Sequence, residues 1–304
     1  MRSFTIDVRG PMHVAGFGTG GPTVVLVHGL GGSHLNWLSI APRLAEDHRV
    51  LALDLPGFGL SPPAGRRCTI PANARALTES ISRLSAGPVI LVGNSMGGLI
   101  SLGVAAMHPQ RVAGLVLVDA ALPRPRGQGL KLEAGLRELI LSHFAGALAW
   151  YVRRLVASGG AESLVRRVLA DCCVDVGRLD PAVVDAHIAL EVERVKDPRW
   201  HESLREAAQS LTLLLAQRDV VEGWVRSLVV PTLLVHGERD RVVSVRAAEA
   251  AADLRPDWEF HVLEDTGHVP MLETPDAFLA SLRGWLQRQP WYLQETQSTP
   301  ALAV

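Results

Sequence analysis

Residues 89–98 read Val89-Ile90-Leu91-Val92-Gly93-Asn94-Ser95-Met96-Gly97-Gly98. An apolar run is followed by a serine that has a glycine two residues before it and another two residues after it. The apolar residues through Val92 predict a strand that is buried on both faces. From Ser95 to Met107 the chain is apolar nearly all round, which predicts a buried helix. The strand and the helix are therefore expected to meet deep in the core, in a sharp turn that carries Ser95.

The turn at Ser95 has the features of a nucleophile's position. Gly93 and Gly97 have no side chains, so the strand and the helix can approach closely while Ser95 is held in a strained conformation. The same turn directs the Met96 backbone N–H and the positive end of the helix at the space where an oxyanion would form. A serine that only caps a helix is the alternative interpretation, but it explains neither the two glycines nor the preceding strand.

Length, composition and charge exclude several classes of protein. The 304 residues, 48% of them hydrophobic, suffice for one large core, either as a single α/β domain or as a core with an insertion. A formal net charge of -1 does not favour nucleic acid or an anionic membrane surface as a partner. Cys68, Cys172 and Cys173 have neither a disulfide pattern nor metal-ligand spacing, and no apolar run reaches membrane-spanning length or resembles a signal peptide. We therefore expect a cytoplasmic protein without a transmembrane segment.

Strands and helices alternate on both sides of the Ser95 turn, which predicts parallel pairing with right-handed crossovers. A glycine-rich run at residues 16–21 superficially resembles a dinucleotide-binding loop. It precedes a strand instead of opening a helix, however, and so indicates only a flexible connection. Strands are expected at residues 3–9, 11–16, 23–27, 50–55, 89–92, 114–119, within 231–240 and at 258–263, and helices at about 36–46, 71–84, 95–107, 246–254 and 275–287.

The alternation breaks between residues 122 and 228, where the pattern is helical only. We interpret residues 122–228 as a helical cap inserted between two parts of one core, residues 1–121 and 229–289, and residues 290–304 as a frayed tail. The paired arginines of the cap are interpreted as parts of solvated helix faces. The alternative is that one of them binds a substrate carboxylate. Its aromatic residues either line a pocket or pack in the ordinary way. These residues are Arg153, Arg154, Arg166, Arg167, Trp150, Tyr151 and Trp200.

A nucleophilic serine needs a neighbouring imidazole to accept its proton. Catalytic groups in parallel sheets gather beyond the carboxyl ends of the strands, which excludes His261 inside its strand and His108 at the far end of a helix. His268, in the loop after the final strand, is the candidate base. His236 and His28 stand at strand ends and are interpreted as structural.

The imidazole in turn needs a carboxylate that fixes its tautomer. Asp240, a few residues beyond a strand end, is the candidate, and Glu238 and Asp119 remain as alternatives. The glycines of residues 28–33 free the backbone to point N–H groups inward, and Leu30 is expected to be the second oxyanion donor beside Met96.

With these residues in place, the chain resembles the α/β-hydrolase superfamily over about residues 3–288. Ser95, Asp240 and His268 follow the superfamily's order of nucleophile, acid and histidine, and the His28-Gly29 turn matches its oxyanion loop. The resemblance implies an eight-stranded, mostly parallel sheet with a helical cap after the sixth strand. It also implies that the protein uses no metal and no organic cofactor.

Several subfamilies share these motifs. Residues 93–98 and Asn36-Trp37 resemble the meta-cleavage product hydrolases, which break carbon–carbon bonds in dienoates, although many of these carry tryptophan where Val269 stands here. Residues 267–275 resemble esterases, lipases and cofactor-free haloperoxidases equally well. A serine at position 95 argues against epoxide hydrolases and haloalkane dehalogenases, which use aspartate there.

The expected function is that of a serine hydrolase acting on a small carboxylic ester through an acyl enzyme. The expected partner is a small molecule with an apolar acyl or aryl group, which the helical cap would select. Two alternatives remain open: a carbon–carbon bond hydrolase of the meta-cleavage product type, and a ligand sensor on the same fold with slow turnover. The sequence does not indicate an oligomeric state.

Overall fold

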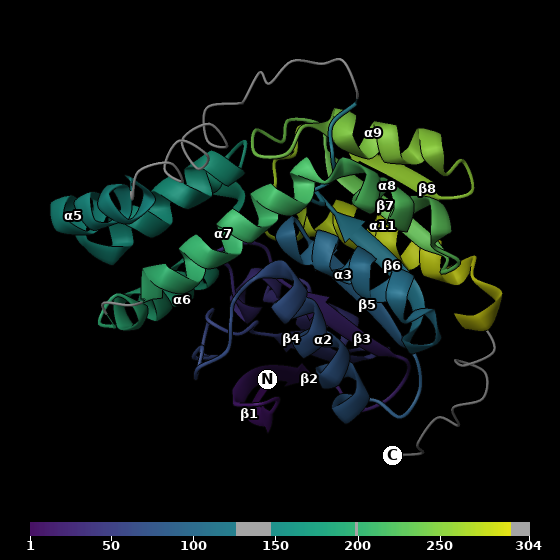
Figure 1. Cartoon of the computed structure of the whole chain (residues 1–304), viewed down its shortest axis with the longest axis horizontal. Coiled ribbons are helices and arrows are strands. Elements are labelled where there is room, and N and C mark those ends of the chain that lie inside the picture. The colour runs from purple at the N-terminus through teal and green to yellow at the C-terminus, as the bar shows by residue number, and fades with distance from the viewer. Residues whose placement is uncertain (126–146, 198–199, 293–304) are drawn as a thin grey trace.

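The computed structural model describes residues 1–125, 147–197 and 200–292, and its centre is an eight-stranded sheet (Figure 1). The strand order is β1-β2-β4-β3-β5-β6-β7-β8. β3 to β8 run parallel, whereas β2 pairs in antiparallel fashion with β1 and β4. This is the mostly parallel sheet that the sequence predicts. The strands are β1 (Arg2–Asp7), β2 (Pro11–Phe17), β3 (Thr23–Val27), β4 (Arg49–Leu53), β5 (Val89–Asn94), β6 (Val112–Val118), β7 (Thr232–Gly237) and β8 (Glu259–Leu263).

Helices cover both faces of the sheet, because alternate residues of a strand point to opposite sides. In β5, Val89 and Leu91 join the apolar cluster on one face, whereas Ile90 and Val92 join the cluster on the other. The prediction of a strand that is buried on both faces is therefore confirmed. The first face is covered by α2 (Ile70–Leu84), α3 (Met96–Met107), α8 (Arg218–Ser227) and α9 (Val245–Leu254), and the second by α1 (Ala41–Leu44), α10 (Pro270–Glu273) and α11 (Pro275–Gln287).

The stretch expected to form one helix over residues 36–46 is divided into two short elements, so that prediction is wrong. A 3-10 turn, η1 (His34–Trp37), is followed by α1, and Pro42 stands in the first turn of α1. Proline has no N–H to donate to the carbonyl four residues back, so a helix begun near Asn36 cannot continue through Pro42 without losing that bond. Ser33 caps η1, and the Asn36 side chain accepts from Ser33 N at 2.9 Å.

In the described part of residues 122–228, the regular structure is helical. α5, α6 and α7 lie together at one side of the sheet, whereas α8 packs against α3 and contributes Val221 and Val225 to the core (Figure 1). The division into cap and core stays a prediction, and α8 shares its core with the sheet. Residues 126–146 and the side chains of Trp150, Tyr151, Arg153, Arg154 and Trp200 lie outside the described residues. The elements are α5 (Ala147–Cys172), η3 (Val176–Arg178), α6 (Pro181–Arg194) and α7 (Trp200–Ala216).

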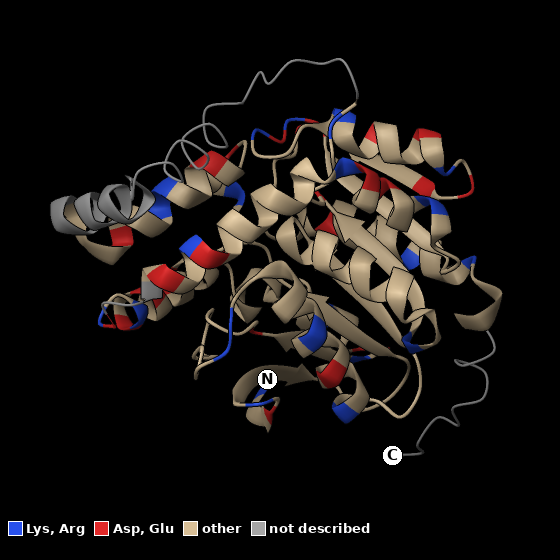
Figure 2. Cartoon of the chain, in the orientation of Figure 1, with Lys and Arg blue, Asp and Glu red and all other residues tan. Residues whose placement is uncertain are grey.

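Charged residues of both signs are mixed over the peripheral helices, and the sheet is almost free of them (Figure 2). Arg166 and Arg167 are exposed and pair with Glu162 and Asp171, each one helical turn away, as expected for solvated faces. Within the described residues, no helix combines the length and the apolarity that crossing a membrane requires.

The chain stays attached to the core through residue 292, the third residue of the stretch expected to fray. Tyr292 is buried, and its hydroxyl shares a 3.0 Å hydrogen bond with His48 Nε2. The Trp291 ring lies 2.9 Å from the position that a Cβ on Gly114 of β6 would take. These two aromatic side chains hold the segment after α11 in place, and residues 293–304 lie outside the described part.

Candidate active site

Ser95 occupies the sharp turn predicted between β5 and α3. Its φ of 53° and ψ of -118° lie outside the helix and strand regions, which is the strained conformation expected at such a turn. The backbone holds it there: Ser95 N donates to Val118 O at 2.9 Å, and Ser95 O accepts from Leu99 N and Ala121 N. The turn thus joins β5, α3 and the end of β6 at one point.

Close packing requires glycine at positions 93 and 97, each two residues from Ser95. A Cβ on Gly93 would overlap the backbone of Gly97, and a Cβ on Gly97 would overlap the carbonyl oxygens of Val27 and His28. β3, β5 and the start of α3 therefore approach as closely as the sequence suggests. Any larger residue at either position would push Ser95 away from the end of β3.

The two segments expected to supply oxyanion donors flank Ser95. A Cβ on Gly29 would lie 3.1 Å from Ser95 Cβ, which places the glycine-rich loop of residues 28–33 against the turn. This loop bends back through a Gly32 N to Gly29 O hydrogen bond of 3.2 Å, and Leu30 lies within the bend. On the other side, Met96 is the first residue of α3, where backbone N–H groups have no partner within the helix. Their role as donors stays a prediction.

His268 and Asp240 are in direct contact. His268 Nδ1 donates to Asp240 Oδ2 at 2.7 Å, and both side chains are buried. The other oxygen of Asp240 accepts from Val242 N at 2.7 Å and Val243 N at 3.0 Å, which fixes the carboxylate in the loop after β7. Burial alone would raise the pKa of Asp240, but the charges and hydrogen bonds of His268 and His236 hold it well below its ordinary value.

The two alternative carboxylates have other partners. Glu238 is exposed and accepts from Asp265 N at 3.1 Å. Asp119, directly after β6, accepts from Gly237 N at 2.8 Å through Oδ1. Burial raises the pKa of Asp119 well above its ordinary value, and the nearby charge of Asp240 raises it further, although His236 opposes the shift. Asp119 therefore favours the neutral form, and Asp240 is the carboxylate that faces His268.

The two histidines interpreted as structural, His28 and His236, contact backbone groups. His28 Nδ1 donates to Gly29 O at 2.7 Å, and His28 Nε2 accepts from Leu55 N at 3.0 Å. Burial lowers the pKa of His28 to about 4, so the neutral ring is favoured. His236 Nε2 lies 2.9 Å from Val243 O and 3.4 Å from Asp240 Oδ2. Both rings support loops of the site, as the sequence suggests.

Asn94 connects the serine turn to the histidine loop, a role that the sequence analysis missed. Its Nδ2 atom donates to His268 O at 3.1 Å and to Val118 O at 3.2 Å. Because Asn94 directly precedes Ser95, this amide ties the nucleophile's turn to the backbone of the candidate base. A polar side chain at the last position of a buried strand is the signal that points to such a role.

A second buried cluster lies behind the glycine-rich loop. Asp54, directly after β4, accepts from the Nδ1 atoms of His13 and His34, each at 2.9 Å, and from Leu60 N at 2.8 Å. Burial alone would raise the pKa of Asp54, but the two imidazoles hold it well below its ordinary value. Among the described residues, two groups place possible metal-ligand atoms within 4.8 Å of one another. Each contains direct N···O contacts at hydrogen-bond distance, and we assign both to hydrogen bonding; they are His13, His34 and Asp54, and Asp119, Asp240 and His268.

One residue of α6 and one of α7 reach the glycine-rich loop. Arg194, the last residue of α6, donates to Gly31 O at 3.2 Å and to Glu191 Oε2 at 3.1 Å, and its side chain is only 10% exposed. Leu204 of α7 lies 3.6 Å from the position of a Cβ on Gly31. α6 and α7 thus place one cationic and one apolar side chain over the loop that faces Ser95.

Comparison with known proteins agrees with the fold. The model of the alpha/beta hydrolase fold family matches residues 22–275. The chain therefore belongs to this family and is a hydrolase of the α/β fold.

Individual relatives differ in what their names describe. A dihydrolipoyllysine-residue acetyltransferase component of an acetoin cleaving system from Pseudomonas putida is 30% identical over 89% of this chain, which spans 65% of that relative's length. A 2-hydroxy-6-oxo-6-(2'-aminophenyl)hexa-2,4-dienoic acid hydrolase from Metapseudomonas resinovorans is 29% identical, and the match covers 88% of this chain and 85% of that relative's length. Among solved structures, a thermophilic esterase from Thermogutta terrifontis has a TM-score of 0.70 at 25% identity, over 95% of this chain and 99% of that one.

Proposed function

We propose that the protein is a serine hydrolase that cleaves a small carboxylic ester through an acyl enzyme on Ser95. The observation that carries the proposal is the 2.7 Å contact of His268 Nδ1 with Asp240, in a loop that Asn94 ties to the turn of Ser95. A carboxylate only accepts hydrogen bonds, so Nδ1 carries the proton and Nε2 is left with a lone pair. That nitrogen is the base that a serine nucleophile requires.

The reaction follows from these roles. Ser95 Oγ attacks the ester carbonyl while His268 Nε2 takes its proton, and the N–H groups of Leu30 and Met96 stabilise the oxyanion. The imidazolium then gives its proton to the departing alcohol, which leaves an acyl group on Ser95. Water attacks the acyl enzyme with His268 again as base, and the carboxylic acid departs as Ser95 recovers its proton. One ester and one water thus yield one acid and one alcohol.

The kind of substrate is inferred from the cap. Leu204 covers the glycine-rich loop, and the space above Ser95 must be closed by the insert that follows β6. We infer a mainly apolar acyl or aryl group on the substrate. The esterase from Thermogutta terrifontis, similar over nearly the whole of both chains, supports an ester as the bond that is cleaved.

The test is a panel of p-nitrophenyl esters of graded chain length, measured with the wild type and two matched serine variants. Ser95→Ala should lose turnover. Ser101→Ala should keep it, because the Ser101 hydroxyl is buried in α3 without a hydrogen-bond partner among the described residues. Undiminished turnover in folded Ser95→Ala would contradict the proposal. Tight binding of a small ligand with negligible turnover of every ester would favour the ligand sensor instead.

Arg194 favours a second candidate, the hydrolysis of a carbon–carbon bond in a dienoate. Such a substrate carries a carboxylate that needs a cationic partner, and Arg194 is a largely buried cation at the loop that faces Ser95. Most other cap arginines with described side chains are far more exposed, for example Arg166 and Arg167. The relative from Metapseudomonas resinovorans, named as a dienoic acid hydrolase, supports this alternative.

The two candidates separate when a dienoate meta-cleavage product is assayed beside the ester panel. Turnover of the dienoate far above every ester would replace the ester function by the carbon–carbon function. In that case Arg194→Gln should raise KM for the dienoate by about tenfold or more, the cost of one lost charged contact. Arg205→Gln is the control, because Arg205 is an exposed arginine of α7 whose guanidinium contacts Gln209. An Arg194→Gln variant with unchanged dienoate kinetics would contradict this assignment.

A further inference from the structure

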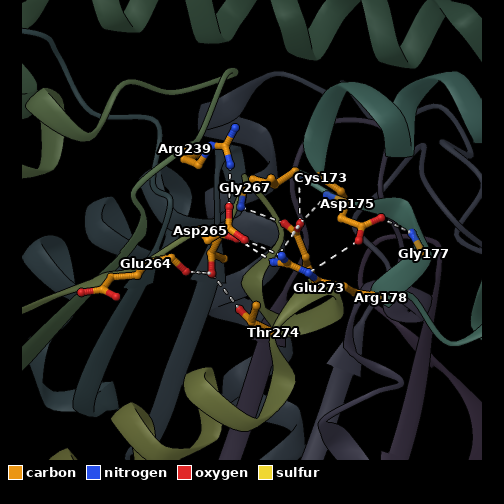
Figure 3. A network of polar contacts seen from close by, with 12 residues as sticks. Cys173, Asp175, Gly177, Arg178, Arg239, Glu264, Asp265, Gly267, Glu273 and Thr274 are labelled. Atoms are coloured by element: carbon orange, nitrogen blue, oxygen red, sulfur yellow. Dashed lines mark hydrogen bonds and ion pairs between the residues drawn. The ribbon is translucent and has the colours of Figure 1, made fainter.

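Glu273, at the end of α10, is a carboxylate whose side chain is fully buried and which accepts three backbone hydrogen bonds (Figure 3). Its Oε2 atom accepts from Gly267 N at 2.8 Å. Its Oε1 atom accepts from Val174 N and from Asp175 N, each at 2.8 Å. A buried carboxylate needs such donors, because each replaces a water that burial removes.

The two segments that Glu273 joins belong to different parts of the protein. Gly267 immediately precedes His268, whereas Val174 and Asp175 lie in the connection between α5 and η3, within the expected cap. A second bond joins the same two segments, since His268 N donates to Cys172 O at 2.7 Å. The backbone of the candidate base is therefore held partly by the end of α5.

The loop that carries Asp240 is attached to the same connection. Arg241, the next residue, donates through Nη2 to Cys173 O at 2.6 Å. An outer ion pair of Arg178 with Asp265 also spans the two segments, but both side chains are substantially exposed and water screens the pair (Figure 3). Through three buried contacts, Glu273 thus links the connection to the histidine loop.

We propose that Glu273 is a positioning residue: it fastens residues 172–175 to the histidine loop so that His268 is aligned with Asp240 only while the α5–η3 connection is seated. The proposal rests on the function proposed above, because it assigns a role to the alignment of His268. Glu273 acts through backbone groups and touches no reacting atom.

The shape of the contact explains why a carboxylate is needed. Both oxygens face N–H donors that lie on opposite sides, and a glutamine can offer an oxygen to only one side. Its amide would turn two hydrogens toward a second set of donors, so one segment would be released. Glu273→Gln therefore separates the two segments while it changes the volume of the side chain very little.

Hydrogen exchange measures the link without any substrate. In Glu273→Gln, amide exchange of residues 172–176 and of residues 265–270 should accelerate together. Glu206→Gln is the matched control, because Glu206 of α7 accepts from Cys68 N at 2.7 Å and ties the cap to another part of the core. Unchanged exchange in Glu273→Gln, or acceleration at only one segment, would overturn the proposal whether or not the protein hydrolyses esters.

Turnover measures the consequence for His268. Glu273→Gln should lower kcat by about 30-fold with KM changed less than about threefold, as expected when a catalytic group is displaced and binding is kept. Arg241→Gln, an exposed and smaller change to the same connection, should lower kcat by about fivefold. Glu206→Gln should leave kcat within about twofold of the wild type. Wild-type kcat in Glu273→Gln would overturn the positioning role, whereas a wild type without ester turnover would overturn only the proposed function.

A double variant distinguishes positioning from simple loss of stability. Replacement of Asp240 by Asn should cost at least about tenfold less in a Glu273→Gln background than in the wild type, because misaligned His268 no longer benefits fully from Asp240. Effects that multiply independently would show that Glu273 only stabilises the fold, and would contradict the proposal.

Discussion

The side-chain amide of Asn94 donates to the backbone carbonyl of His268 at 3.1 Å, across a separation of 174 residues in the chain. This one contact ties the turn of Ser95, after β5, to the loop of His268, after β8. The same amide reaches Val118 O at the end of β6, so it also fixes one of the two strands that lie between β5 and β8 in the sheet. The geometry of the site thus depends on a residue that takes no part in the proposed chemistry.

Two variants of Asn94 should separate its role from its volume. Asn94→Ala removes both donated bonds, and we expect kcat for a p-nitrophenyl ester to fall by about 10- to 100-fold through misplacement of His268. Asn94→Asp should lose more than Asn94→Ala, because a carboxylate would face two carbonyl oxygens. Steady-state kinetics beside circular dichroism measures both effects. An aspartate variant as active as the wild type would show that the donated bonds are dispensable.

Asp240 and Asp119 should respond very differently to the same substitution. Asp240→Asn should lower kcat by about four orders of magnitude, because the amide no longer selects the Nδ1–H tautomer of His268. Asp119→Asn should cost less than about tenfold, because burial raises the pKa of Asp119 and an amide resembles its neutral form. Kinetics of both variants at pH 7 measures the ranking. The reverse order would move the catalytic acid to the end of β6.

The pKa of His28 predicts how stability depends on pH. Its folded-state pKa of about 4 lies below the ordinary value of 6.5, so the unfolded chain binds more protons between these values. Stability should therefore decrease as the pH falls from about 6.5 to 4, and His28 should contribute about 3 kcal/mol to that loss.

Urea unfolding across this range, with the wild type and His28→Gln, isolates the contribution of His28. The glutamine does not titrate, so its free energy of unfolding should depend less steeply on pH between 6.5 and 4. Parallel curves for the two proteins would contradict a buried, neutral His28. Asp54 and Asp240, whose folded-state pKa values are depressed, should add their losses at lower pH, below about 4.

Much of the fold and the main features of the candidate site could be predicted from the sequence. The apolar run before Ser95 and the strand–helix alternation are local patterns, and they predicted the parallel sheet correctly. Asp240 and His268 were predictable because residues after parallel strands gather at one edge of a sheet. Their contact is confirmed, whereas their catalytic role stays a prediction.

Other features depend on contacts between distant segments, which no local pattern reports. Asn94 belongs to the serine motif, but its partner is a backbone carbonyl. Arg194 ends α6, which also carries exposed charges, and only the packing of this helix shows that the arginine reaches Gly31. The division of residues 36–46 follows from Pro42, a local signal that the apolar periodicity concealed.

Selection among substrates should depend on the cap. Leu204→Ala removes an apolar side chain above the glycine-rich loop, and we expect the preference among p-nitrophenyl esters to shift toward longer or bulkier acyl groups. Each methylene in such a pocket changes discrimination by about 1 to 3 kcal/mol, so kcat/KM ratios should change by about tenfold. Leu213→Ala, at an exposed position of the same helix, is the control. A chain-length profile identical in all three proteins would place specificity outside this part of the cap.

Labelling with a fluorophosphonate probe tests the central claim most directly, because the probe reacts with a serine only when a base activates it. We expect one phosphonylated residue, mapped by peptide mass spectrometry to Ser95, in the wild type. We expect labelling to be lost in Ser95→Ala, kept in Ser101→Ala, and reduced by at least about 100-fold in folded His268→Ala. Absence of labelling in the folded wild type, or undiminished labelling in His268→Ala, would contradict the pairing of Ser95 with His268.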